Sequence, residues 1–174
     1  MNAAPEAVTQ ARLMLTPGRY CILDVETTDL DGSIVEIAVI AADSGETLFD
    51  ELIDPAGIPI SEEAASVHGL AAIDLVGARQ WSQVYPDLAA AIGERHVAAY
   101  NYRFDLGRIV HDCKRSGIDA GTVMDESRWI CLMNLRSVAR GDGIRLRLGG
   151  GHRALGDVRA ARDVLLAIAA GIAV

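Results

Sequence analysis

The chain has 174 residues, a formal net charge of −8 and 51% hydrophobic residues. This length suits one globular domain with a substantial core, and 23% charged residues exclude wholesale disorder. A polyanion is also expected to bind nucleic acid poorly wherever affinity depends on Lys and Arg neutralising phosphates.

The net charge conceals an asymmetry between the two halves of the chain. Residues 1–87 carry 3 basic and 15 acidic side chains, whereas residues 88–174 carry 13 basic and 9 acidic ones. Lys114 is the only lysine, so arginine supplies nearly all the positive charge. Because the planar guanidinium suits bidentate recognition of phosphate, an anionic partner stays open.

The cysteines indicate a reducing compartment. Cys21, Cys113 and Cys131 are odd in number and form no C-x-x-C pair, so neither a disulfide framework nor a thiolate metal site is expected. The N-terminus lacks the pattern of a signal peptide, and the longest apolar run, 164–174, is short against the ~20 residues of a membrane span. We therefore expect a cytoplasmic protein without a membrane partner.

The predicted elements, in chain order, describe one α/β domain. Residues 1–18 are expected to be an N-terminal extension with a short helix after Pro5. Three strands at 19–25, 34–42 and 46–53, joined by short turns, predict an antiparallel meander. The expected elements that follow are helices at 64–75 (broken at Gly69) and 81–92, a strand at 96–100, a helix at 104–115, a strand at 128–131, a helix at 133–140, a loop rich in Gly and Arg at 141–151 and a helix at 154–170. This order predicts a mixed sheet with helices on its faces.

Two carboxylates stand at the end of the first predicted strand. Asp24 and Glu26 are two residues apart, so their side chains project from the same face. Like charges this close raise each other's pKa unless a cation lies between them, and Mg²⁺ and Mn²⁺ prefer carboxylate oxygens. The alternative is a strand end that opens into solvent at Thr27 and Thr28, where exposed acids cost little.

Three further polar residues stand at predicted helix starts or in a loop. Asp105 lies at a strand–helix junction, and Asp157 lies one turn into the last helix, five residues after His152. Each carboxylate alone is explained by the preference of helix N-termini for negative charge, and His152 alone by an ordinary loop position.

The motifs in combination resemble the DEDDh family of 3′–5′ exonucleases. The resemblance covers about residues 20–169 and is carried by Asp-x-Glu at 24–26, Asn-x-x-Phe-Asp at 101–105 and His-x-x-x-x-Asp at 152–157. The flanking Val-His-Gly-Leu at 67–70 is also similar to the family. The resemblance implies a ribonuclease H-like fold, with a mixed five-stranded sheet flanked by helices, in an exonuclease domain at 19–174.

The resemblance also implies residue roles. Asp24, Glu26, Asp105 and Asp157 would hold two Mg²⁺ or Mn²⁺ ions, and His152 would be the general base that takes a proton from the attacking water. Substrate-binding roles are implied for the residues that would hold the terminal nucleotide or approach the strand, namely Thr27, Thr28, Leu30, His68 and Asn101. A core-facing Leu30 and a helix-terminal His68 beside Gly69 are the structural alternatives.

Two positions depart from the family pattern. Asp29 stands where Gly is frequent, and Tyr100 stands where His often precedes the Asn. Both departures lie near the expected entrance of the strand, so they bear on substrate preference and leave the ligands and the base intact.

The leading hypothesis is a metal-dependent 3′–5′ exonuclease that acts on single-stranded DNA or RNA and releases nucleoside monophosphates. Its partners would be nucleic-acid 3′ ends, and its acidity favours weak, distributive action; homodimer formation, known among relatives, stays open. A non-catalytic nucleic-acid or protein-binding module that retains the fold is the alternative, although binding alone needs none of the four carboxylates together. A small-molecule phosphoesterase would use the same metals but would not need the arginine-rich second half.

Overall fold

A computed structural model describes residues 2–149 and 151–174. Its strands are β1 (Tyr20–Thr27), β2 (Ile34–Ala41), β3 (Thr47–Asp54), β4 (Arg79–Gln80), β5 (His96–Ala99) and β6 (Trp129–Cys131). Its α-helices are α1 (Pro5–Met14), α2 (Glu62–His68), α3 (Trp81–Ile92), α4 (Tyr102–Arg115), α5 (Leu132–Arg140) and α6 (Ala154–Ala169). Short 3₁₀ helices are η1 (Ala72–Leu75), η2 (Gly121–Met124) and η3 (Glu126–Arg128).

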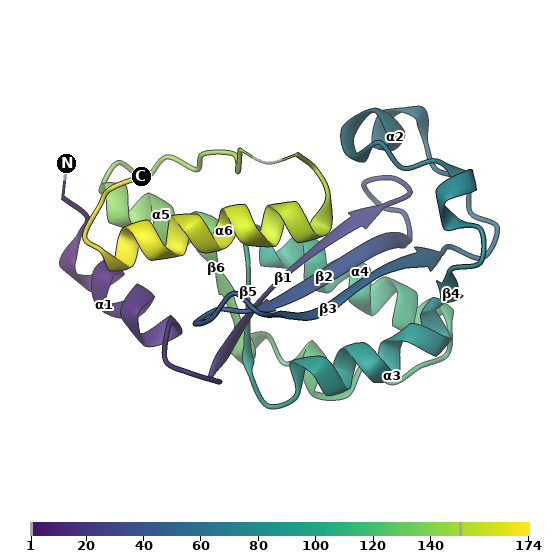
Figure 1. Ribbon diagram of the computed structural model, residues 1–174, viewed down its shortest axis with the longest axis horizontal. Coiled ribbons are helices and arrows are strands. Elements are labelled where there is room, and N and C mark those ends of the chain that lie inside the picture. The colour runs from purple at the N-terminus through teal and green to yellow at the C-terminus, as the bar shows by residue number, and fades with distance from the viewer. Residues whose placement is uncertain (1, 150) are drawn as a thin grey trace.

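The strands form one mixed sheet in the order β4-β3-β2-β1-β5-β6 (Figure 1). The predicted meander is confirmed, because β2 pairs antiparallel with both β1 and β3. Strands β5 and β6 add in parallel beside β1, as crossover connections through helices allow. The sheet has six strands where five were expected, because the two residues of β4 pair in parallel with the end of β3.

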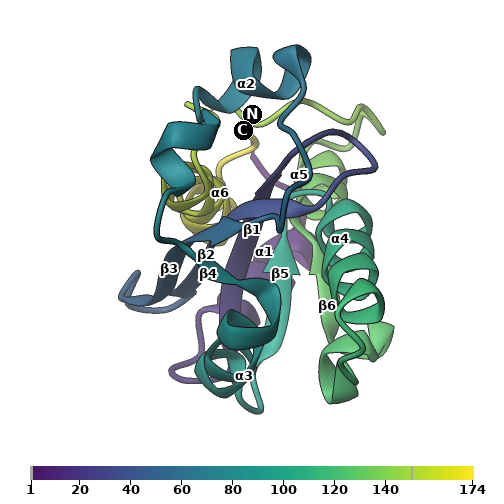
Figure 2. The same ribbon diagram turned by 90° about the vertical axis from the view of Figure 1, so that its right-hand side faces the viewer.

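Helices cover both faces of the sheet, with α6 and α4 on opposite sides (Figure 2). The period of two along β1 divides the core. Cys21, Leu23 and Val25 pack with residues of α3 and α4, whereas Tyr20 and Ile22 pack with residues of α1, α5 and α6. Asp24 and Glu26 continue the second set, so β1 directs both carboxylates toward the face that α6 covers.

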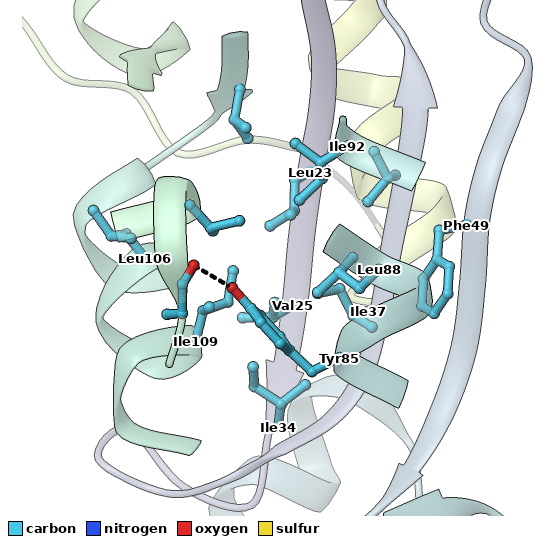
Figure 3. Packing of buried hydrophobic residues seen from close by; sticks show 14 of the residues in the cluster. Leu23, Val25, Ile34, Ile37, Phe49, Tyr85, Leu88, Ile92, Leu106 and Ile109 are labelled. Atoms are coloured by element: carbon cyan, nitrogen blue, oxygen red, sulfur yellow. Dashed lines mark hydrogen bonds between the residues drawn. The ribbon is translucent and has the colours of Figure 1, made fainter. Parts of the chain in front are cut away.

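A hydrophobic core fills the space between helices α3 and α4 and the face of the sheet that they cover. Figure 3 shows Leu23, Val25 and Ile37 of the sheet packed with Leu88 of α3 and Ile109 of α4. The dashed line in Figure 3 marks the hydrogen bond that the Tyr85 hydroxyl donates to the carbonyl of Ala120 at 2.6 Å. A fully packed strand face leaves β1 little freedom to shift, which holds its polar end in place.

The helical region after β3 divides where the sequence predicts. Helix α2 ends at Gly69, whose φ of 73° lies in the left-handed region that glycine adopts without strain, and η1 follows as a separate piece. Helix α2 lies across the end of the sheet at which β1 terminates (Figures 1 and 2).

The N-terminal segment contains the expected helix, α1, which packs against α5 and α6. The backbone N–H of Ala3 donates to Gly171, and Arg12 donates to Ala169. The division of the chain at residue 18 stays a prediction.

The three cysteines are free thiols, of which Cys21 and Cys113 are buried and Cys131 is half-buried. None of the helices within residues 2–149 and 151–174 is long and apolar enough to cross a membrane.

Candidate active site

Three carboxylates meet where β1 ends beside the start of α6. Asp24 and Glu26 come from β1, and Asp157 comes from the first turn of α6. One carboxylate oxygen from each lies within 4.8 Å of the other two. The period of two in β1 supplies the first pair, and the docking of α6 on the same face supplies the third member from 131 residues further along the chain.

The environment of this cluster opposes negative charge. Burial, followed by the charges of Asp105, Glu26 and Asp157, raises the pKa of Asp24 well above its ordinary value. Burial and the charge of Asp157 raise the pKa of Glu26 to about 8. Burial likewise raises the pKa of Asp157, against the opposing effect of His152.

Asp105 approaches the cluster from the opposite side of β1. It lies in the first turn of α4, is 3% exposed, and raises the pKa of Asp24 through its charge. Burial raises its own pKa to about 7, although hydrogen bonds with its own backbone and that of Val25 oppose the shift. Its oxygens are outside the set that lies within 4.8 Å, so the structure brings three of the four predicted ligands into mutual reach and the fourth alongside.

His152 stands at the open side of the cluster. Its Nδ1 is 4.0 Å from Asp157 Oδ2, and its side chain is 54% exposed. Its φ is 49°, in the left-handed region that few residues other than glycine adopt. Such backbone strain is typical of functional sites, where it fixes the direction of a side chain.

An ion pair that sequence reasoning missed holds this loop against the sheet. Both oxygens of Glu36, on β2, accept from Arg153 Nε at 3.0 Å, and Glu36 Oε1 also accepts from Nη2 at 2.6 Å. Glu36 Oε2 further accepts from the backbone N–H of Ala154, the first residue of α6. Glu36 is the β2 partner of Glu26, so one strand pair places both carboxylates. A signal existed in the sequence, because a charged residue inside the apolar run at 34–41 requires a buried partner.

The donor set fits a divalent cation. Asp157 Oδ1 is buried and has no hydrogen-bond partner among the described residues, and a buried acceptor left in this state is costly. Three carboxylates whose pKa values rise together need positive charge, and the guanidinium whose charge opposes the rise at Glu26, that of Arg153, is hydrogen-bonded to Glu36. Hard cations with oxygen ligands satisfy both needs.

A cleft of about 620 Å³ opens beside the carboxylates. Glu26 and Thr27 line it from β1, Leu30 from the following turn, and Phe104 from α4. Leu30 is 77% exposed, so it is not the core residue that the alternative required. The cleft combines apolar surface with one edge of the carboxylate cluster, which suits a nucleotide with its base and its phosphate at different ends.

Three of the predicted substrate residues serve the turn that shapes this cleft. Thr27 is 7% exposed, and its hydroxyl donates to the Asp29 carbonyl at 2.8 Å. Thr28 is 1% exposed, and its hydroxyl accepts from the backbone N–H of Ser33. His68 also lines the cleft, but only 4% of it is exposed. Its ring is held by two backbone hydrogen bonds, in which Nδ1 accepts from Leu70 N and Nε2 donates to the Thr27 carbonyl. Burial lowers the pKa of His68, in keeping with this neutral, doubly bonded ring.

Asn101 does not share the cleft with the other substrate candidates. It is exposed and lines a second cavity of about 220 Å³ on the other side of the first turn of α4, together with Arg103 and Arg145. The structure therefore places Thr27, Leu30 and His68 at the cleft, Asn101 at the second cavity, and Thr28 at neither.

Comparison with known proteins identifies the family. The family model of the RNase T exonucleases matches residues 21–165, which is most of the chain. The chain belongs to this DEDDh exonuclease family. Membership of the RNase T family confirms the resemblance that the motifs carry, and it indicates a nuclease of a class that depends on divalent metal.

Curated relatives differ greatly in length. The uncharacterized exonuclease CP81 of Escherichia phage 186 is 28% identical over 171 residues, which cover 86% of this chain and 87% of the phage protein. The PolC-type DNA polymerase III of Streptococcus suis (strain 98HAH33) is 28% identical over 122 residues, which cover 67% of this chain. The matched part spans only 8% of that polymerase.

Solved structures that are similar to this chain have the same fold. Exonuclease X in complex with 5′-overhanging duplex DNA has a TM-score of 0.55 and 23% identity, over 85% of this chain and 90% of that one. E. coli exonuclease I in complex with a dA16 oligonucleotide has a TM-score of 0.70 and 17% identity, over 85% of this chain and 40% of that one. The ribonuclease H-like fold predicted from the motifs is thereby confirmed.

Proposed function

We propose that the protein is a 3′–5′ exonuclease that hydrolyses phosphodiester bonds at the 3′ end of single-stranded DNA or RNA and releases nucleoside monophosphates. The observation that carries the proposal is the convergence of Asp24, Glu26 and Asp157 within 4.8 Å, beside the imidazole of His152 and at the edge of a 620 Å³ cleft.

The four carboxylates Asp24, Glu26, Asp105 and Asp157 would hold two divalent cations, Mg²⁺ or Mn²⁺. Such a pair, when bound, makes water more acidic and stabilises the departing 3′-oxygen of an in-line displacement. The pKa values of the carboxylates are raised partly by their mutual repulsion, and the positive charge of these ions would offset that repulsion.

His152 acts as the general base in this proposal. Its exposed ring lies at the rim of the cluster, where it takes a proton from the attacking water and passes it to solvent. The left-handed backbone at His152 and the anchored Arg153 beside it keep the ring at that rim.

The cleft holds the terminal nucleotide. Leu30 and Phe104 offer apolar surface to the base, and Thr27 stands beside Glu26 where the sugar would meet the carboxylates. His68 supports this site by fixing the Thr27 carbonyl, and Thr28 supports it by closing the turn at Ser33. A direct contact of His68 with nucleic acid would require one of its two backbone hydrogen bonds to open.

Purified protein with Mn²⁺ or Mg²⁺ should shorten a strand labelled at its 5′ end one nucleotide at a time. The same strand labelled at its 3′ end should release labelled mononucleotide at once. DNA and RNA of one sequence, tested in parallel, determine the sugar preference. Release of mononucleotide from the 5′ end would refute the polarity, and binding without hydrolysis under all four conditions would favour the binding module.

A further inference from the structure

Three consecutive residues in the first turn of α4 face three different environments. Asp105 is buried beside Asp24, Phe104 lines the 620 Å³ cleft, and Arg103 is exposed and lines the 220 Å³ cavity. Successive helical residues are about 100° apart around the axis, so one turn can serve all three. The start of α4 therefore lies between the cleft and the cavity.

The smaller cavity is chemically unlike the cleft. Two arginines and two asparagines line it, and among the described residues that surround it none is acidic; these four are Asn101, Arg103, Asn134 and Arg145. Asn101 is the N-cap of α4, but its side chain makes no cap hydrogen bond among the described residues, so its amide is available to a ligand. Guanidinium and amide groups together offer only donors and neutral acceptors, which suits an anion.

The positive charges of the two arginines in this cavity are not neutralised by an ion pair among the described residues. Neither Arg103 nor Arg145 forms an ion pair with a carboxylate among the described residues, in contrast to Arg79, Arg140 and Arg153. Glu126 is the carboxylate that acts most on the pKa of Arg103, and the two residues share a neighbouring cavity, but Glu126 does not line the smaller one. An anion that enters the smaller cavity thus meets two guanidinium groups without a competing carboxylate.

The loop that carries Arg145 is fixed on both sides of that residue. Asp142 accepts from the backbone N–H of Ile144 at 2.9 Å, and the Tyr100 hydroxyl donates to the Leu146 carbonyl at 2.9 Å. Arg136 Nη1 in turn donates to the Tyr100 hydroxyl at 2.9 Å. Tyr100 is one of the two departures from the family pattern. The hydrogen bond to Leu146 gives this departure a structural role, because a tyrosine hydroxyl at position 100 reaches the loop that carries Arg145.

We propose that the cavity of Arg103 and Arg145 binds the phosphodiester backbone of the substrate strand, on the 5′ side of the nucleotide that is removed. This inference rests on the proposed function, because with the 3′-terminal nucleotide in the cleft, the cavity across the first turn of α4 would receive the nucleotides that precede it. A planar guanidinium binds phosphate in a bidentate manner, and two of them facing one cavity would hold the backbone of the next nucleotides.

The experiment compares substrates that differ in the number of phosphates. An eight-nucleotide strand extends past the scissile bond into the cavity, whereas a dinucleoside monophosphate contains the scissile phosphate alone. The variant is Arg103→Ala/Arg145→Ala, and the control is Arg147→Ala, which removes an exposed arginine of the same loop that does not line the cavity. Both proteins should keep the wild-type melting temperature, because all three side chains are exposed.

In the double variant, the KM for the eight-nucleotide strand should rise about tenfold and the kcat should be unchanged. The kinetics on the dinucleoside monophosphate should match the wild type, and Arg147→Ala should behave as wild type on both substrates. Binding of a labelled eight-nucleotide strand is measured by fluorescence anisotropy in EDTA at several salt concentrations. The plot of log association constant against log salt concentration should be shallower by about 1.4 for the double variant than for the wild type, as loss of two phosphate contacts predicts.

An unchanged KM for the long strand, an equal loss on both substrates, or an equal loss in Arg147→Ala would overturn the inference. Failure of the wild type to hydrolyse any strand would instead overturn the proposed function. In that case the anisotropy measurement still decides about the cavity, because an unchanged salt slope in the double variant means that the two arginines do not bind phosphate.

Discussion

Arg153 and Glu36 join the start of α6 to the middle of the sheet, over 117 residues of sequence. The Glu36 side chain is 5% exposed, and it accepts from both the guanidinium and the first N–H of α6. Arg153 follows the proposed base His152 directly and precedes the ligand Asp157 by one helical turn. The pair therefore positions two of the proposed catalytic groups without touching the substrate.

Arg153→Ala should lower both stability and turnover. It leaves the buried Glu36 carboxylate without its cation, and we expect a loss of about 1–3 kcal/mol, below the value for fully buried pairs because the Arg153 side chain is half exposed. Urea unfolding measures this loss. The kcat should fall while the KM changes little, since α6 and His152 lose their anchor but the cleft is intact.

The double variant Glu36→Gln/Arg153→Met tests whether the pair acts as a unit. It should recover part of the stability that Arg153→Ala loses, because no unpaired buried charge remains. Its kcat should stay low, since the anchor of the loop is still missing. Recovery of both quantities would show that the pair contributes to folding alone.

Asp24→Asn should weaken the pH dependence of stability in the metal-free protein. Burial and neighbouring charge raise the pKa values of Asp24 and Asp157, and that of Glu26 to about 8. Groups with raised pKa values stabilise the fold fully below their unfolded values near ~4 and lose that contribution as the pH rises through their folded values. The wild-type melting temperature in EDTA should therefore fall between about pH 5 and pH 8 by more than that of Asp24→Asn.

Mn²⁺ should restore the wild type at pH 8, because a ligand that binds only the folded state stabilises it. The gain should be smaller at pH 5, where protons compete for the carboxylates, and smaller in Asp24→Asn at either pH. Thermal unfolding with and without EDTA measures all of these shifts. Equal gains in the wild type and Asp24→Asn would place the metal elsewhere.

His152→Asn should reduce kcat by about 10²–10⁴-fold, the usual contribution of a general base, and should leave stability unchanged. Asparagine tolerates the left-handed backbone that His152 adopts, so the loop keeps its conformation. Single-turnover hydrolysis measures the loss, and metal-dependent thermal stabilisation is the control. A variant that still gains stability from Mn²⁺ but does not cleave supports the base; full activity would refute it.

Gly32→Ala should disturb the turn that carries Leu30. A Cβ at Gly32 would overlap the Thr28 hydroxyl and the backbone nitrogen of Asp29, and the Gly32 carbonyl accepts from Arg108 on α4. We expect a loss of about 1–3 kcal/mol and a higher KM. The matched control is Gly107→Ala in α4, where a Cβ meets nothing within 4 Å and helix propensity favours Ala by about 1 kcal/mol. Thermal unfolding separates the two substitutions.

Much of the fold could be predicted from local pattern. The bounds of α3 were predicted at 81–92 and the break in the helical region was predicted at Gly69, because apolar periodicity and a glycine C-cap are local properties. The strand β4 was missed, since two residues carry no periodic signal and pair only because the end of β3 lies beside them.

The shared face of Asp24 and Glu26 on β1 follows from the sequence alone, because side-chain alternation requires no tertiary contact. The sequence also carries the motifs that place the chain in the RNase T exonuclease family. The proximity of Asp157 to those two carboxylates, with Asp105 alongside, depends on how the helices pack against the sheet. The same packing places Arg103 and Asn101 at a cavity separate from the cleft. The reason is physical: the direction and charge of these groups depend on how α4 and α6 dock on the sheet, and burial acts only after docking.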